Sequence, residues 1–177
     1  VTEYLGIDQA AAFQGMLKAY PDFGSLKIWR IEQDSPAGSW YFASLFSAND
    51  PESTRLALAR LQEKGLLEKR QIIGLLCLRS DRGDRSLQWL EAFKDGVFPD
   101  VNKLALFGEQ AWLLKKKLKA VTGMEICIFK KQAPENVMAQ LLAAEKKGAV
   151  LLGIGNMGGP GESFVNYWEK TGKPYDA

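Results

Sequence analysis

The stretch that decides the fold is WYFASLFSANDPEST, residues 40–54. Its first seven residues are almost wholly apolar, as expected of a β-strand that is covered on both faces of a sheet. Asp50 is a good N-cap and Pro51 suits the first helical position, so a helix is expected over residues 51–64. Gly65 suits the position that follows a helix. The chain is therefore expected to pass from a buried strand through a short loop into a helix, which is the building unit of an α/β fold.

The same alternation continues toward the C-terminus. Strands are expected over residues 70–79, 103–107, 125–129 and 149–154, and helices over residues 85–94, 109–119, 134–147 and 162–171. This order predicts right-handed crossovers and a Rossmann-like, mainly parallel sheet flanked by helices. A further strand over 25–33, followed by a turn over 34–38, is expected to form one antiparallel edge.

An additional helix is expected at the N-terminus, over residues 9–20. Asp8 is its candidate cap, and Pro21 stops it. The sequence begins with Val1 rather than Met, in what looks like the middle of an element. We therefore expect the chain to be a fragment of a longer protein.

Composition limits the possible functions. The 177 residues carry 23 Lys and Arg against 21 Asp and Glu, so the formal charge of +2 gives no general reason to expect a nucleic-acid partner. The absence of histidine excludes a Ser–His or Cys–His nucleophile pair and the usual zinc sites, unless another chain supplies the missing groups. Cys77 and Cys127 lie in apolar runs and are expected to be buried, reduced thiols of a cytosolic protein.

Three further observations point to a role in the fold or exclude a membrane span. No apolar run reaches the ~18 residues of a membrane span. The lysine-rich run over residues 115–119 is expected to be the solvated face of a helix. The tryptophans are expected in the core, at Trp29, Trp40, Trp89, Trp112 and Trp168.

Three polar segments each follow a predicted strand, over residues 47–54, 80–85 and 153–161. Because the carboxyl ends of parallel strands meet at one edge of an open α/β sheet, these segments predict a shared ligand site. In the first, a helix N-terminus with Ser53 and Thr54 is suited to a carboxylate or phosphate. The alternative is that this segment only caps its helix.

The second segment places Arg82 and Arg85 three residues apart, which suits a bidentate clamp on a carboxylate or phosphate. The alternative is a solvated turn with local Asp–Arg pairs. The third segment is dense in glycine, and glycine allows a backbone to approach a ligand closely. It matches neither the dinucleotide fingerprint nor a phosphate loop, so its alternative is a mobile crossover loop.

Taken in order, these segments resemble the C-terminal domain of the Mur-ligase superfamily of ATP-dependent amide-bond ligases. The stretch over residues 48–53 resembles that family's Ala-His-Asn-Pro stretch, and Ser80-Asp81-Arg82 is similar to its Gly-Asp-Arg stretch. The run over 153–156 stands where the family has a Gly-Lys-Gly-His-Glu-like loop. Residues 5–8 and 15–17 resemble the tail of the family's central ATPase domain. Within the superfamily, the chain is most similar to the poly-γ-glutamate synthases, the capsule-polymer ligases.

The resemblance implies that residues 1–22 are the tail of the preceding ATPase domain, or a linker helix, and that residues 23–177 are the C-terminal Rossmann-like ligase domain. It implies an ATP-dependent acid–amino-acid ligase that polymerises glutamate through γ-carboxyl amide bonds. This domain would hold the incoming amino acid and would be inactive without its ATPase domain, which would bind most of the ATP and Mg²⁺. Alternatives are another Mur-type amino-acid ligase, or a Rossmann-like nucleotide-binding or assembly module.

The resemblance also implies site residues and partners. No catalytic residue and no metal ligand is expected within this chain. The partners implied are glutamate, the growing polyglutamate chain and small membrane subunits of a capsule complex, with a homo-oligomer as a further option and no nucleic acid. The protein would be cytoplasmic and associated with the membrane through those subunits. The substrate-binding residues implied are Asn49, Ser53, Thr54, Asp81, Arg82, Arg85, Gly155, Asn156, Gly158 and Gly159.

Overall fold

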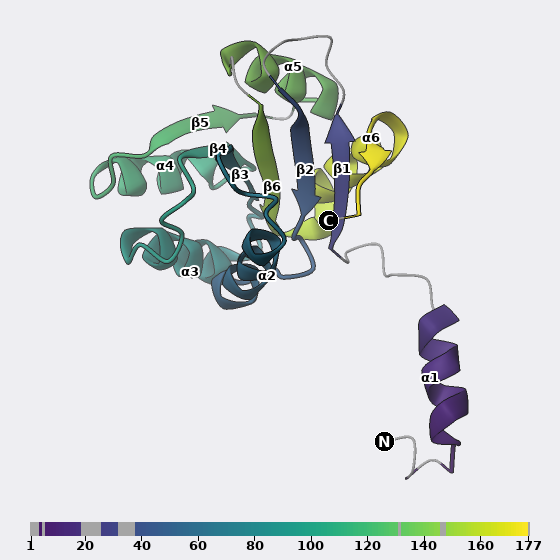
Figure 1. Ribbon diagram of the computed structural model, residues 1–177. Coiled ribbons are helices and arrows are strands. Elements are labelled where there is room, and N and C mark those ends of the chain that lie inside the picture. The colour runs from purple at the N-terminus through teal and green to yellow at the C-terminus, as the bar shows by residue number, and fades with distance from the viewer. Residues whose placement is uncertain are drawn as a thin grey trace.

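A mainly parallel sheet forms the centre of the computed structural model, which describes residues 4, 6–18, 26–31, 38–130, 132–145 and 148–176 (Figure 1). Within these residues the sheet has seven strands in the order β5-β4-β3-β6-β2-β1-β7. The strands are β1 (Lys27–Ile31), β2 (Trp40–Ser44), β3 (Gln71–Cys77), β4 (Lys103–Phe107), β5 (Glu125–Phe129), β6 (Ala149–Gly155) and β7 (Lys173–Pro174).

Helices cover both faces of this sheet. They are α2 (Pro51–Glu63), α3 (Gly83–Lys94), α4 (Ala111–Lys119), α5 (Pro134–Ala144) and α6 (Glu162–Thr171). The described residues also form a separate helix, α1 (Gln9–Lys18), and a short π-helical turn, η1 (Met157–Gly161). Side chains of α2, α3 and α4 pack into one hydrophobic cluster, and those of α5 and α6 pack into a second cluster on the other face. Every residue of β2 and of β6 is buried, as the apolar runs predicted.

The predicted α/β class and the antiparallel edge are both confirmed. Strands β2, β6, β3, β4 and β5 are parallel, whereas β1 is antiparallel to β2 and to β7. The strand expected over 25–33 is described at Lys27–Ile31, and the predicted turn at 34–37 lies outside the described residues. Strand β7 was not predicted. It consists of two residues that pair with the edge strand β1.

Several helix boundaries differ from the expected ones by one to three residues. Helix α3 begins at Gly83, two residues before the expected start, and α4 begins at Ala111, two residues after it. Helix α5 ends at Ala144, and residues 146–147 of the expected helix are not described. Such shifts are ordinary where helix ends are set by local hydrogen bonds.

Helix α1 buries none of its residues and stands apart from the sheet in Figure 1. Its apolar side chains Phe13, Met16 and Leu17 are all exposed. The assignment of residues 1–22 to a preceding domain or linker stays a prediction. Among the described residues, no helix has the length and apolar character needed to cross a bilayer.

The core contains most of the side chains expected there. Trp29, Trp40, Trp89 and Trp168 are buried, whereas Trp112 is 63% exposed, so the core prediction is wrong for that residue. Both cysteines are free. Burial raises the pKa of the Cys77 thiol and that of the half-buried Cys127, so both stay protonated at neutral pH.

The strand order places a topological switch point at the carboxyl end of β6. Strands β2 and β3 flank β6 and lead into α2 and α3 on one face, whereas β6 leads into α6 on the other face. Loops that leave neighbouring strands toward opposite faces open a crevice between them, which is where open α/β sheets bind ligands. The three polar segments follow these three strands, so they meet at one edge, as predicted.

Candidate functional site

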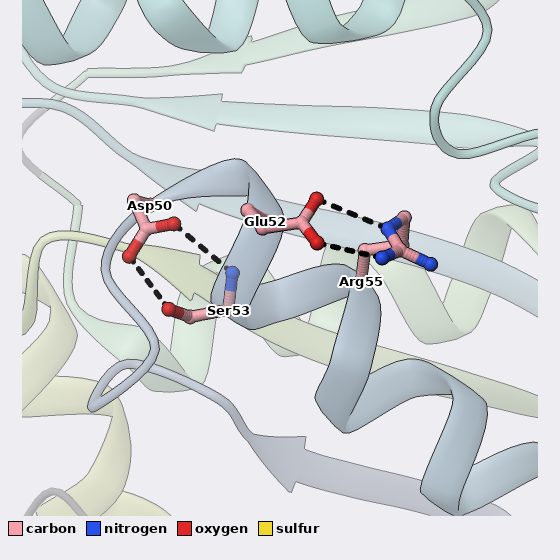
Figure 2. Close-up of polar contacts among 4 residues, drawn as sticks. All are labelled: Asp50, Glu52, Ser53 and Arg55. Atoms are coloured by element: carbon pink, nitrogen blue, oxygen red, sulfur yellow. Dashed lines mark hydrogen bonds and ion pairs between the residues drawn. The ribbon is translucent and has the colours of Figure 1, made fainter.

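The loop after β2 is closed by its own side chains. Asp50 caps α2 by accepting hydrogen bonds from the Ser53 amide at 3.0 Å and from the Ser53 hydroxyl at 2.8 Å (Figure 2). These two donors favour the ionised form and hold the pKa of Asp50 below its usual value. One turn later, Arg55 donates two hydrogen bonds to Glu52 on the exposed side of the helix.

In this loop the side chain of Thr54 is buried, whereas that of Asn49 is exposed to solvent. Thr54 is fully buried, and its hydroxyl donates to the Ala48 carbonyl at 2.7 Å. The hydroxyls of Ser53 and Thr54, which were expected to contact a ligand, thus both donate within the loop in this structure.

The loop after β3 is built around a local ion pair. Arg79 donates two hydrogen bonds to Asp81, at 2.9 and 2.8 Å, and this contact lowers the pKa of the Asp81 carboxyl. Arg82 precedes the first residue of α3 and is exposed. Its side chain makes no hydrogen bond or ion pair with another described residue, so its guanidinium is open to a ligand.

Arg85 lies in a groove that runs along α3 and is closed on one side by the N-terminus of α2. Asp50 lines the same groove, and the charge of Arg85 makes a small contribution to the low pKa of Asp50. The remaining charged groups of the groove are acidic, namely Glu52, Asp84 and Glu91. Arg85 forms no ion pair within the described part of the chain, so it is the one cation among four carboxylates of this groove.

The glycine-rich loop after β6 is held against its neighbours by main-chain contacts. The Asn156 amide and side chain both donate to the Cys77 carbonyl, at 2.9 and 3.2 Å. Gly155 has φ +84° and lies so close to β3 that a Cβ there would be 2.6 Å from the Cys77 carbonyl oxygen. Gly158 lies beneath Arg79, where a Cβ would meet the guanidinium at 2.7 Å, whereas Gly159 (φ +81°) faces open space.

The structure therefore brings the loops together in pairs. The loops after β3 and β6 meet through Arg79 and Gly158, and Phe46 of the first loop packs beside Gly153 and Gly161. Arg85 and Asp50 share the groove between α2 and α3. Of the ten expected binding residues, Arg85 lines this groove and Asp81 lines a second cavity nearby.

This second cavity, which we call the β3–β5 pocket, lies beyond the carboxyl ends of β3, β4 and β5 and has a volume of about 500 Å³. Its walls are mainly apolar, from Leu78, Phe107, Trp112, Ile128 and Pro160. Its charged groups are Arg79, Asp81, Glu109 and Lys130. Because Asp81 already binds Arg79, Lys130 is the cation of this pocket that has no carboxylate partner among the described residues.

Sequence reasoning missed most of this pocket. Glu109 and Lys130 follow β4 and β5 in loops too short to stand out as polar segments, and Arg79 ends an apolar run. The feature of the sequence that these three residues share is that each lies at or just after the end of a strand. Gln110 joins these loops, since its amide donates to the Ser80 carbonyl at 3.2 Å and its side-chain oxygen accepts from the Ser86 hydroxyl.

The described residues do not form a metal site. They contain no group of three or more His, Cys, Asp or Glu side chains placed to hold a metal ion. The glycine-rich loop after β6 lacks the Gly-Lys-Ser/Thr that holds nucleotide phosphates. The arrangement instead offers isolated cations, which are suited to carboxylate or phosphate groups.

Comparisons with known proteins found a matching family model and two relatives. A family model described as "Poly-gamma-glutamate synthase CapB C-terminal domain" matches residues 31–171. "PGA synthase CapB" of Bacillus subtilis (strain 168) is 31% identical over 169 residues, which cover 93% of this chain and 41% of that protein. "Capsule biosynthesis protein CapB" of Bacillus anthracis is 30% identical over 171 residues, which cover 94% of this chain and 35% of that protein. The chain thus spans less than half the length of these two relatives.

The family model covers most of the chain, including the switch point at β6 and the β3–β5 pocket. The chain belongs to the family of poly-gamma-glutamate synthase CapB C-terminal domains.

Proposed function

We propose that this chain is the glutamate-holding C-terminal domain of an ATP-dependent acid–amino-acid ligase that makes poly-γ-glutamate. The observation that carries the proposal is the match of the family model over residues 31–171. The names of the two relatives support a role in polyglutamate and capsule synthesis. The resemblance of the three loops to the Mur-ligase superfamily supports the ligase chemistry.

The proposed reaction has two steps. An oxygen of a γ-carboxylate attacks the terminal phosphorus of ATP, which forms an acyl phosphate and releases ADP. The nitrogen of an incoming amino group then attacks the acyl carbon, so a C–N bond forms, the C–O bond to phosphate breaks, and inorganic phosphate leaves. The nitrogen loses a proton, and the product is a γ-linked amide.

Arg82 and Arg85 are the proposed clamps for the glutamate carboxylates or the acyl phosphate. Both lie in or next to the first turn of α3, where the helix dipole also favours an anion. Neither forms an ion pair with a described residue, and a guanidinium can hold a carboxylate or phosphate through two parallel hydrogen bonds. Their positive charge would stabilise negative charge that develops on the transferring group.

The other expected residues have supporting roles in this proposal. Asn156 fixes the glycine-rich loop to β3, Gly155 and Gly158 allow its close packing, and Gly159, which faces open space, leaves room for a ligand. Asn49, Ser53 and Thr54 shape the loop after β2, and Asp81 keeps Arg79 over Gly158. These residues would shape the site and hold its loops in place, so none of them is assigned a role in breaking or forming bonds.

ATP and Mg²⁺ belong to another part of the proposed enzyme. The described residues offer neither a phosphate loop nor a metal-binding cluster, so no step through Mg²⁺ is assigned to this chain. The proposed full-length protein would bind ATP and Mg²⁺ in a preceding ATPase domain. It would act in the cytoplasm beside the membrane, with small membrane subunits, and with a homo-oligomer as an option.

The test is glutamate-dependent ADP release by the full-length protein, with the partner subunits it needs, compared with its Arg85→Ala form. Loss of the clamp should lower the rate at least about a hundredfold, or roughly 2.7 kcal/mol of barrier. Arg60→Ala is the matched control, because Arg60 is exposed near the other end of α2. Its rate should stay close to that of the unchanged protein.

The other outcomes separate two parts of the proposal. Release that needs glutamate but ignores the Arg85 change would keep the ligase and remove Arg85 from its site. If release does not depend on glutamate with any set of subunits, the poly-γ-glutamate function is wrong.

A further inference from the structure

Helix α4 carries lysines that the proposed reaction does not use. Its inward side is formed by Ala111, Leu114 and Leu118, which are buried. Intervals of three, four and seven residues place Lys115, Lys116 and Lys119 on the same side of the helix as Trp112. We call these four residues the α4 lysine face.

The charges of this face have no opposite partner in the described part of the chain. None of its lysines forms an ion pair with a described residue. Like charges three or four residues apart on a helix repel one another. The C-terminal end of the helix dipole offsets part of that repulsion. The face is therefore a concentrated positive surface that an external anion would stabilise.

The α4 lysine face continues directly into the β3–β5 pocket. Trp112 belongs to both, since it lines the pocket while the Lys116 ammonium lies 5.6 Å from its ring centroid. Helix α4 packs beside β5, because Leu114 and Leu118 of α4 and Ile126 of β5 belong to one buried cluster. Lys130 then follows β5 into the pocket. In Figure 1, α4 lies along β4 and β5 at one end of the sheet.

We propose that the α4 lysine face binds the growing poly-γ-glutamate chain and guides it past the β3–β5 pocket. This inference rests on the proposed function, and it identifies the surface that holds the polymer. The occupant follows from charge complementarity, because a γ-linked chain keeps one free α-carboxylate on every residue. Its main chain also contains two methylene groups per residue, which are suited to packing on the exposed ring of Trp112.

The spacing of the charges supports this occupant. Standard bond lengths give an extended γ-glutamyl repeat of about 6 Å. Side chains three or four residues apart on a helix are separated by about 5–6 Å at Cβ. Because the repeat has five main-chain bonds, successive α-carboxylates point to opposite sides of an all-trans chain. A turn about one methylene bond brings two neighbouring carboxylates to the same side, where they can meet Lys116 and Lys119. A flat membrane would contact Trp112 and the lysines but would not enter the concave pocket that adjoins them.

The test measures binding of a labelled γ-linked oligomer, long enough to span α4, and of a labelled γ-linked dimer to the full-length protein. The variant carries Lys116→Glu and Lys119→Glu, both at exposed positions. Its affinity for the long oligomer relative to the dimer should fall at least about tenfold, which is about 1.4 kcal/mol. The dependence of binding on salt should also become weaker, because fewer counterions are released.

The matched control reverses two exposed lysines elsewhere, with Lys18→Glu and Lys170→Glu. It makes the same change in net charge and should leave the preference for the long oligomer within about twofold, because surface charges far apart are screened. Thermal unfolding of both variants confirms that they fold. A milder variant, Lys116→Gln with Lys119→Gln, should give an intermediate loss.

Two results would overturn the inference. One is an unchanged preference for the long oligomer in the Lys116→Glu, Lys119→Glu variant. The other is that this variant keeps oligomer binding but loses binding to phosphatidylserine vesicles, which would assign the face to a membrane. ADP release with the dimer as acceptor separates the proposals. If the unchanged protein releases no ADP with the dimer, the ligase function is refuted. If it releases ADP and the Lys116→Glu, Lys119→Glu variant keeps the preference for the long oligomer, only the role of the α4 lysine face is refuted.

Discussion

The loops that follow β2 and β6 leave neighbouring parallel strands, yet the two are built in opposite ways. The first closes on itself through side chains, with Asp50 bound to Ser53 and Thr54 bound to the Ala48 carbonyl (Figure 2). The second is shaped by its main chain, which packs against β3 and is held to it by Asn156. One loop uses polar side chains for folding, and the other uses the absence of side chains.

This difference shows that a pattern typical of ligand loops can be required by the fold. The hydroxyls of the first loop and most glycines of the second have structural contacts. The groups left open at this edge are cations outside these two loops, namely Arg82, Arg85 and Lys130. Changes in the two loops should therefore affect mainly stability, and changes in the cations should affect mainly binding.

The largest effect is expected at Gly155. An alanine Cβ there would lie 2.6 Å from the Cys77 carbonyl oxygen, at a φ of +84° that L-residues rarely adopt. Because the obstacle is backbone, β3 or β6 would have to shift. Gly155→Ala should lower the free energy of unfolding by about 3 kcal/mol, measured by urea denaturation.

Gly159 provides the control for this prediction. Its φ of +81° is nearly the same, but a Cβ there would meet nothing within 4 Å. Gly159→Ala should therefore cost only the strain of its backbone conformation (φ +81°, ψ −116°), about 1–2 kcal/mol. Equal losses at the two positions would mean that the close packing of this loop on β3 does not matter.

Much of the fold could be predicted from the sequence, because the fold depends on strong local signals. The strands buried on both faces are apolar runs, and α2 begins at a residue pair that both caps and starts a helix. Strand β7 was missed because two residues that include a proline carry no strand signal. The π-helical turn η1 was missed because it depends on the main-chain angles of its glycines.

The site was predictable only as far as strand order can be guessed. The three long polar segments correctly indicated the sheet edge, but the β3–β5 pocket depends on which strands are neighbours. Trp112 was wrongly expected in the core because apolar character does not tell which helix face the sheet covers. Its neighbours Ala111 and Leu114 face the sheet instead.

The next effect in size is expected at Thr54, in the loop after β2. Thr54→Val keeps the shape of this fully buried side chain but leaves the Ala48 carbonyl without its 2.7 Å donor. The free energy of unfolding should fall by about 1–2 kcal/mol, as measured in urea. If instead stability is unchanged and the Michaelis constant for glutamate rises, Thr54 contacts the ligand rather than the loop.

A smaller effect is expected at Asp50, and it should depend on pH. Asp50→Ala removes the helix cap and should cost about 1 kcal/mol at neutral pH. Asp50→Asn keeps a capping side chain and should cost less, so it isolates the charge. Thermal unfolding of the three proteins as a function of pH checks both expectations.

The sign of this pH dependence follows from the direction of the pKa shift. The pKa of Asp50 in the folded protein lies below its ordinary value of 3.8, chiefly because the Ser53 amide donates to the carboxylate. The stability due to its charge is therefore complete above pH 3.8 and is lost as the pH falls through the lower folded value. The unchanged protein and Asp50→Asn should converge in that acidic range, and a constant difference would contradict the role of charge.

The smallest effect is expected for the Glu52–Arg55 pair, which lies one turn beyond Asp50 (Figure 2). Both side chains are exposed, so solvent screens their attraction and Arg55→Ala should leave the unfolding midpoint within experimental error. The contact should still be visible by NMR titration. Arg55 lowers the pKa of Glu52, so its removal should return that pKa toward 4.5. If Arg55→Ala lowers stability as much as Asp50→Ala does, the Glu52–Arg55 pair instead stabilises the loop after β2.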